Sequence, residues 1–348
     1  MTQSNDNSAK RNVPLTPFKP PFGLSNPHLQ TVLSSKGPRK VNRDRRFKPY
    51  VGSQKRVLLD GGEGIRLEGY HNQVVATADP AAEPQAEELI IMIHGWEGSH
   101  ESTYMKSMAA TVLNAGFDTF RLNMRDHGDS HHLNKGVFNS TLIEEVIHSI
   151  ADLQKRLNYK RYSLVGFSLG GNFCLRVAAN AHGRPINLQQ VIAFCPVIHA
   201  QQSNDVLNQT RNAFYGKYFV RKWRRSLQKK LDCWPEYEFG EQLVKLKTLD
   251  QMNDAFIPKY TEFSVIEDYF DAYAIAGDKM SKTICPCYLH FAKDDMIIPV
   301  DGVHLLADNP DLHVTITEHG GHCGYLSNWR GDSWQDHRAL EIIQAALV

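Results

Sequence analysis

The sequence predicts an α/β fold with a mostly parallel sheet, helices on both faces, a helical cap insertion and an N-terminal arm. Short apolar runs alternate with amphipathic segments of helical length, which is the pattern of β-α-β crossovers. This alternation stops near residue 200 and resumes near residue 284. We therefore expect an arm at residues 1–54, a core at residues 55–200 and 284–348, and a helical cap at residues 201–283.

The composition is that of an ordinary globular protein, because 42% hydrophobic and 22% charged residues exclude a disordered or collagen-like chain. The formal net charge of +1 conceals an asymmetry. Residues 1–60 hold twelve Lys/Arg and three Asp/Glu, a net charge of +9, so the remaining residues carry a net charge of −8. We expect no nucleic-acid partner for a chain whose formal net charge is close to zero. Without a secretory signal, a spanning apolar run or a regular cysteine framework, we expect a cytoplasmic protein with reduced thiols.

From about residue 12 to residue 50 the sequence is rich in Pro, Lys and Arg and has little periodicity, so we expect an arm laid over the core rather than a domain. Two strand-like runs follow at residues 56–59 and 66–70, joined by a glycine-rich turn. This pattern predicts an antiparallel hairpin.

The core elements follow from hydrophobic periodicity. We expect strands at residues 89–93, 117–124, 162–166, 191–195, 287–292 and 314–317. We expect helices at residues 105–113, 141–157, 169–181, 302–307 and 333–347. Thr141 and Glu144 have the spacing of a capping box, which predicts a side-chain cap at the start of the second of these helices.

The cap region is aromatic and helix-like at residues 206–231 and 265–276. Residues 216–230 hold seven Lys/Arg and no acidic residue. An apolar stripe recurs every four residues at Tyr215, Phe219, Trp223, Leu227 and Leu231. Such a basic helix either packs its stripe on the core or lies on an anionic membrane surface, and the sequence leaves both hypotheses open.

A candidate nucleophile stands in the pentapeptide from Gly166 to Gly170, where a predicted strand ends and a helix begins. A serine at such a tight turn is lifted out of the sheet, and small neighbours allow the backbones to approach closely. We therefore expect Ser168 to be the nucleophile. Its hydroxyl needs a base, and the base needs an acid that orients it.

The acid and the base are expected in the loops that follow the last two strands. Asp294 and Asp295 come directly after the strand at residues 287–292. We prefer Asp295 as the acid because it begins the pattern Asp-x-apolar-apolar-Pro, and Asp294 is the alternative. Two glycines precede His322 after the final strand, so His322 is the expected base and His319 its rival.

Acyl transfer also needs hydrogen-bond donors for the oxyanion. We expect the backbone N–H groups of Leu169, directly after the serine, and Trp96, in the glycine-rich loop after the strand at residues 89–93. No phosphate-binding glycine motif occurs, and the His and Asp residues at 126–132 are interpreted as a polar loop. We expect no cofactor and no metal ion.

Together these motifs resemble those of the α/β-hydrolases and, more narrowly, of the YheT-like group. The residues that carry the resemblance are Pro17-Phe18 and Pro27-His-Leu-Gln-Thr31 in the arm, His94-Gly-x-Glu-Gly-Ser99, Gly166-x-Ser168-x-Gly-Gly171, Thr248-Leu249, Phe263-Ser264 and Tyr269-Phe270 in the cap, Asp294-Asp295, and Gly320-Gly-His322. The resemblance implies carboxylic-ester hydrolysis through an acyl-enzyme on Ser168, with Asp295 and His322 as partners.

The functional expectation is a serine carboxylesterase that acts on a small-molecule or lipid-like ester such as an acylglycerol. The alternatives are a thioesterase and a non-catalytic binding protein on the hydrolase fold. A peripheral contact with anionic membranes through the basic cap helix is a further expectation for its partners.

Overall fold

The computed structural model describes residues 16–74 and 86–347, so the expectations for residues 1–15 lie outside the described residues. The described residues form an eight-stranded sheet in the order β1-β2-β4-β3-β5-β6-β7-β8. The strands are β1 (Lys55–Asp60), β2 (Arg66–Asn72), β3 (Glu88–Ile93), β4 (Asp118–Leu122), β5 (Arg161–Phe167), β6 (Gln190–Phe194), β7 (Cys287–Ala292) and β8 (Leu312–Thr317). β1 pairs antiparallel with β2 and β2 antiparallel with β4, whereas the pairs from β4 to β8 are all parallel. The predicted hairpin and mostly parallel sheet are confirmed.

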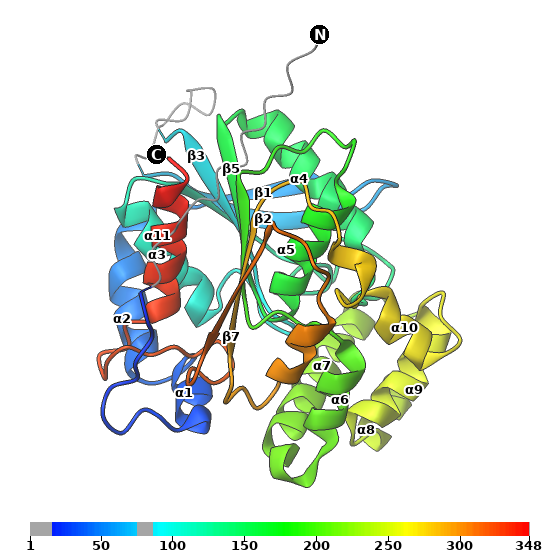
Figure 1. Ribbon diagram of the computed structural model, residues 1–348. Helices are drawn as coiled ribbons and strands as arrows, with labels where there is room; N and C mark the ends of the chain where they lie inside the picture. The colour runs from blue at the N-terminus through cyan, green and yellow to red at the C-terminus, as the bar shows by residue number, and fades with distance from the viewer. Residues whose placement is uncertain (1–15, 75–85, 348) are drawn as a thin grey trace.

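The central strands are buried on both faces, which explains their unbroken apolar runs. In β3, Ile90 and Met92 contribute to one hydrophobic core, and Leu89 and Ile91 to the other. Helices α3 (Thr103–Asn114) and α11 (Trp334–Ala345) cover the first core, and α4 (Ile143–Leu157) and α5 (Leu169–Asn180) cover the second (Figure 1). The predicted helices on both faces are therefore confirmed.

Two local predictions are wrong. Leu142 precedes α4 without a side-chain cap, because the Thr141 hydroxyl donates to Asn139 Oδ1 at 2.6 Å and Glu144 pairs with Arg184 at 2.8 Å. A residue two positions earlier in the chain thus takes the Thr141 hydroxyl, and a distant arginine takes the Glu144 carboxylate, so neither group is left for a capping box. The helix expected at residues 302–307 is a 3₁₀ segment, η4 (Val300–Leu305).

The described part of the arm, residues 16–54, forms α1 (Pro27–Leu33), α2 (Pro38–Phe47) and a 3₁₀ turn, η1 (Lys48–Tyr50). Both α-helices begin with proline, whose fixed φ and missing N–H suit the first helical position. The Asn26 side chain accepts hydrogen bonds from the N–H groups of His28 and Leu29 and so caps α1. The prolines that suggested an arm rather than a domain therefore also start its two α-helices.

The chain between β6 and β7 forms helices and no strand, as the sequence predicts. The α-helices are α6 (Ala200–Asn208), α7 (Ala213–Cys233), α8 (Gly240–Lys245), α9 (Leu249–Tyr260) and α10 (Ile266–Ala272). They lie at the same end of the sheet as α1 (Figure 1). The single helical stretch expected at residues 206–231 is interrupted by a 3₁₀ turn, η2 (Thr210–Asn212).

The apolar stripe of the basic helix α7 packs inward. Tyr215, Trp223 and Leu227 are buried in the larger hydrophobic core. Lys230 is also buried, and its Nζ lies 2.8 Å from Asp126 Oδ1. The packing hypothesis therefore accounts for the stripe, and a membrane contact would depend on the exposed cations of α7 such as Arg221. None of the described helices combines the length and apolarity that crossing a bilayer requires.

The stability of the arm is predicted to depend on Gln30, which is fully buried. Its Nε2 donates to Leu24 O at 2.7 Å, and its Oε1 accepts from the N–H of Leu326 at 2.7 Å. Gln30→Ala leaves these buried backbone groups without partners, so we expect urea unfolding to show a loss of about 2–4 kcal/mol. The exposed Gln228→Ala is the control, with an expected change within about 0.5 kcal/mol. Equal stability of the two variants would contradict the prediction.

Candidate active site

Ser168 lies at the sharp turn between β5 and α5 with φ 54° and ψ −122°, a backbone conformation that L-residues rarely adopt. Glycine is required on both sides of it. A Cβ on Gly166 would lie 2.4 Å from Gly170 O, and a Cβ on Gly170 would lie 2.3 Å from His94 O. The Ser168 N–H donates to Phe194 O of the neighbouring strand at 2.8 Å, which ties the turn to the sheet.

The predicted base and acid meet Ser168 from two other loops. His322, after β8, places Nε2 2.9 Å from Ser168 Oγ. Its Nδ1 lies 2.8 Å from Asp295 Oδ2, after β7. Since a carboxylate accepts hydrogen bonds, Nδ1 carries the proton, and the unprotonated Nε2 of the neutral ring faces the serine hydroxyl.

The two adjacent aspartates have different partners. Asp295 faces His322, and its second oxygen accepts from the N–H groups of Ile297 and Ile298 at 2.8 and 3.0 Å. Asp294 accepts from the Gly321 N–H at 2.8 Å and lies 3.3 Å from His319 Nδ1. The alternative acid and the rival base thus pair with each other, and Asp294 holds the loop that carries His322.

Burial lowers the pKa of His322, but the charge of Asp295 and its hydrogen bond outweigh burial and raise the pKa above the usual value near 6.5. The Asp295 side chain is 2% exposed and the His322 side chain 11% exposed. The pair is therefore shielded from water, which strengthens its electrostatic interaction.

The two predicted oxyanion donors lie beside the serine. Trp96, Leu169 and Ser168 line the same cavity. In the described part of the chain, the backbone N–H groups of Trp96 and Leu169 have no hydrogen-bond acceptor. Both N–H groups are therefore free to donate to an oxyanion.

Two side chains that were not predicted to belong to the site shape the loop of Trp96. The Tyr104 hydroxyl accepts from the Gly95 N–H at 3.0 Å, and His127 Nε2 accepts from the Glu97 N–H at 3.1 Å. Burial lowers the pKa of His127 to about 4, so its ring is neutral and can accept. The sequence places His127 after the strand that became β4, but it does not predict the hydrogen bond with the Glu97 N–H.

The arm takes part in the site directly. Thr31 Oγ1 in α1 accepts from the His322 N–H at 2.9 Å. His28 Nδ1 lies 2.9 Å from the hydroxyl of Tyr215 in α7, so α1 bridges the His322 loop and the cap. The arm motif that supported the family resemblance therefore has a structural role at the site.

Two thiols lie beside the imidazole. One potential ligand atom from each of Cys195, His322 and Cys323 falls within 4.8 Å of the other two. Because both ring nitrogens of His322 already face Ser168 and Asp295, a soft metal ion bound there would compete with those contacts. All six cysteines are free.

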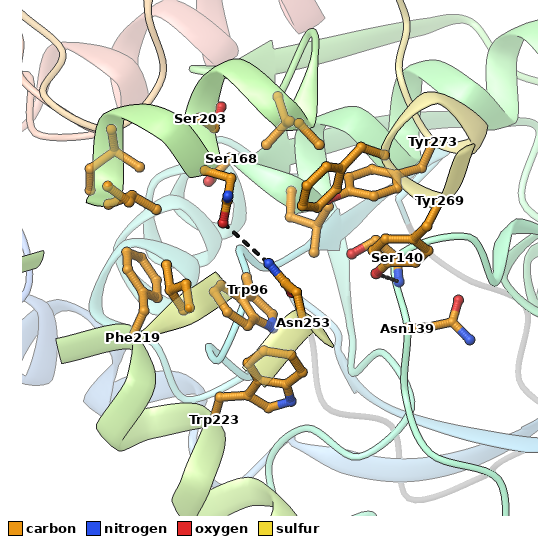
Figure 2. A pocket seen from close by; sticks show the side chains of 18 of the residues that line it. Trp96, Asn139, Ser140, Ser168, Ser203, Phe219, Trp223, Asn253, Tyr269 and Tyr273 are labelled. Atoms are coloured by element: carbon orange, nitrogen blue, oxygen red, sulfur yellow. Dashed lines mark hydrogen bonds between the residues drawn. The ribbon is translucent and has the colours of Figure 1, made fainter. Parts of the chain in front are cut away.

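Two cavities meet at Ser168. The cap pocket has a volume of about 830 Å³, including the part open to solvent, and is lined mostly by aromatic and aliphatic side chains. Figure 2 shows Trp96, Phe219 and Trp223 on one wall and Tyr269 and Tyr273 on the other. The arm cleft has a volume of about 1510 Å³ on the same basis and lies between the arm, α7 and the loop of Trp96. His322 lines the arm cleft and not the cap pocket.

Comparisons with known proteins agree with this architecture. A family model described as "alpha/beta hydrolase fold" matches residues 88–328. "Putative esterase YheT" of Escherichia coli (strain K12) is 23% identical over 323 residues, which cover 89% of this chain and 87% of that protein. "Monoacylglycerol lipase" of Saccharomyces cerevisiae is 21% identical over 259 residues, 72% of this chain and 57% of that protein. The solved structure of the Pyrococcus furiosus esterase Pf2001 is 15% identical, covers 95% of this chain and 98% of its own, and has a TM-score of 0.53, which shows the shared fold.

The two aspartates provide a matched test. Asp295→Asn removes the charge that stabilises a protonated His322, so we expect kcat for ester hydrolysis to fall by about 10⁴-fold. Asp294→Asn removes the same charge one residue away but leaves the Asp295–His322 contact, so we expect a loss of less than about 100-fold. Equal losses in steady-state kinetics would contradict the assignment.

The pH profile gives a second test. Only neutral His322 can accept the serine proton, so kcat/KM for a neutral ester should rise with pH through the pKa of His322. Because Asp295 raises this pKa, the rising limb should lie above pH 6.5 in the wild type. In Asp295→Asn the residual activity should show its rising limb at lower pH. A midpoint that stays in place would show that His322 is not the titrating group.

Proposed function

We propose that this chain, which belongs to the α/β-hydrolase fold family, is a serine hydrolase that cleaves carboxylic esters through an acyl-enzyme intermediate. The observation that carries the proposal is the continuous hydrogen-bonded path from Ser168 Oγ through His322 to Asp295, with distances of 2.9 and 2.8 Å. The serine end of this path faces the cap pocket, which is lined by Ser168, Trp96 and Leu169. The esterase and lipase names of relatives aligned over most of this chain also support it.

In the first half-reaction, Ser168 Oγ attacks the ester carbonyl carbon while His322 Nε2 takes the hydroxyl proton. The oxyanion that forms accepts hydrogen bonds from the N–H groups of Trp96 and Leu169. Asp295 stabilises the imidazolium, which then gives the proton to the leaving alcohol as the carbonyl–oxygen bond breaks. The acyl group remains on Ser168.

In the second half-reaction, His322 takes a proton from water, and the resulting hydroxide attacks the acyl carbon. The tetrahedral intermediate collapses, Ser168 Oγ leaves with the proton from His322, and a carboxylic acid departs. The same groups therefore serve both steps, and the free enzyme is regenerated.

The cap pocket suits an apolar acyl chain. Its walls include Phe219, Trp223 and Tyr269, and burying a methylene group against such surfaces contributes about 0.8 kcal/mol. A polar patch interrupts the apolar lining, where Asn253 Nδ2 donates to Asn204 Oδ1 at 3.2 Å. We therefore propose lipid-like esters as the substrate class.

Activity-based labelling tests the nucleophile. A fluorophosphonate should label the wild type, and Ser168→Ala should lose the label and at least about 10⁴-fold of kcat for p-nitrophenyl esters. Ser281→Ala, at an exposed position away from both cavities, is the matched control and should label normally. A wild type that neither labels nor hydrolyses these esters would favour the binding-protein alternative.

The acyl-chain preference should depend on the cap pocket. Ala200 is 3% exposed and lines this pocket. Ala200→Phe fills part of the cavity, so we expect kcat/KM for a p-nitrophenyl octanoate to fall at least about tenfold relative to the acetate. Leu207→Phe, another lining position, repeats the test if the first variant folds poorly. An unchanged octanoate-to-acetate ratio in folded variants would place the acyl chain elsewhere.

A further inference from the structure

The side of the serine from which the leaving group departs follows from the position of His322. In the proposed esterase reaction, on which this inference rests, the imidazolium must protonate the leaving oxygen or sulfur. The leaving group must therefore lie in the cavity that His322 lines. That cavity is the arm cleft, because His322 and Cys323 line it and neither lines the cap pocket.

Three lysines line the arm cleft. Lys36 and Lys40 come from the arm, and Lys222 comes from α7 on the other side. Within residues 16–74 and 86–347, none of the three forms a salt bridge or a side-chain hydrogen bond. Lys222 is half-buried, whereas Lys36 and Lys40 are exposed.

The other charged groups of the cleft are already engaged. Arg43 Nη1 donates to Glu101 O at 3.0 Å, and Arg43 Nε lies 2.7 Å from Asp44 Oδ1. The Glu101 carboxylate pairs with Lys106 Nζ at 2.5 Å. The three lysines are therefore the cations of the cleft that remain free for a ligand.

Two acidic side chains, Glu97 and Glu101, line the same cleft. Among the described residues, Glu97 forms no ion pair, so its charge is the one that could repel an anion. Burial raises its pKa to about 7, and the charge of Lys222 acts in the opposite direction. A large fraction of the Glu97 carboxyl groups is therefore neutral at neutral pH. A bound anion would raise the pKa of Glu97 further and so increase that fraction. The cleft keeps a positive potential beside the reacting serine.

We propose that the arm cleft binds a leaving group that bears a phosphate, with Lys222 holding it from the cap and Lys36 and Lys40 from the arm. A phosphate carries up to two negative charges and several acceptor oxygens, which three separate ammonium groups can share. The acyl chain lies in the cap pocket and the phosphate-bearing part in the arm cleft, with the scissile bond at Ser168. Both a glycerol phosphate ester and a coenzyme A thioester have this chemistry.

Matched substrates test the proposal. The four substrates share an octanoyl chain: the esters 1-octanoylglycerol 3-phosphate, neutral 1-octanoylglycerol and p-nitrophenyl octanoate, and the thioester octanoyl coenzyme A. At low ionic strength we expect kcat/KM for at least one phosphate-bearing substrate to exceed that of neutral 1-octanoylglycerol by about tenfold or more. The advantage should shrink as salt increases, because salt screens the lysines. The better of the two phosphate-bearing substrates identifies the source of the phosphate.

The outcomes separate this inference from the proposed function. If p-nitrophenyl octanoate and neutral 1-octanoylglycerol are hydrolysed as well as the phosphate-bearing substrates, the phosphate subsite is wrong and the esterase proposal stands. If none of the four substrates is hydrolysed, the esterase proposal fails and the subsite with it.

Variants locate the effect. Lys222→Met and the double variant Lys36→Met/Lys40→Met should each lower the ratio of kcat/KM between the preferred phosphate-bearing substrate and neutral 1-octanoylglycerol at least about fivefold, chiefly through KM. Lys222→Arg should restore the ratio. Lys217→Met removes a cation of α7 that does not line the cleft and should keep the wild-type ratio. Wild-type ratios in both cleft variants, or an equal loss in Lys217→Met, would overturn the subsite.

Discussion

The arrangement of the proposed site depends on the strained turn at Ser168. A left-handed φ of 54° at a non-glycine residue is unfavourable by roughly 1–3 kcal/mol and persists only where its surroundings over-determine it. Here the turn is held by close backbone packing at Gly166 and Gly170 and by the hydrogen bond from the Ser168 N–H to Phe194 O. The close contact at Gly170 comes from the end of β3, and the Phe194 carbonyl comes from β6, so the assembled sheet holds the turn.

The remaining groups of the proposed site converge because parallel strands end at a common edge. The loops after β3, β5, β7 and β8 contribute Trp96, Ser168, Asp295 and His322. The loops are then fixed by partners from elsewhere in the chain. Asp294 and Thr31 hold the backbone around His322, and His127 holds the loop of Trp96. Each contact replaces a backbone group's hydration with one fixed partner, which pre-organises the site.

Part of the positive charge of the N-terminal region lies at the arm cleft. Residues 1–60 carry a net charge of +9, and the arm places Lys36 and Lys40 at the cleft that His322 lines. The basic helix α7 faces the same cleft through Lys222, while its apolar stripe fills the core and Lys230 neutralises Asp126. Two basic segments far apart in the sequence thus contribute to one cavity. The cap lines the pocket on one side of Ser168, and the arm lines the cleft on the other side.

The sequence by itself determined the alternation of strands and helices, the turn at Ser168 and the order along the chain of the proposed nucleophile, acid and base, because hydrophobic period and glycine spacing act between near neighbours. It also reduced the candidates for the acid to Asp294 and Asp295. Only the tertiary structure decided which carboxylate faces His322, since that choice depends on loops that approach from separate strands. It also decided that Glu144 pairs with Arg184, that Thr31 of the arm holds the backbone of His322, and that Cys195 lies beside His322. These features depend on partners distant in the chain, and no local pattern specifies them.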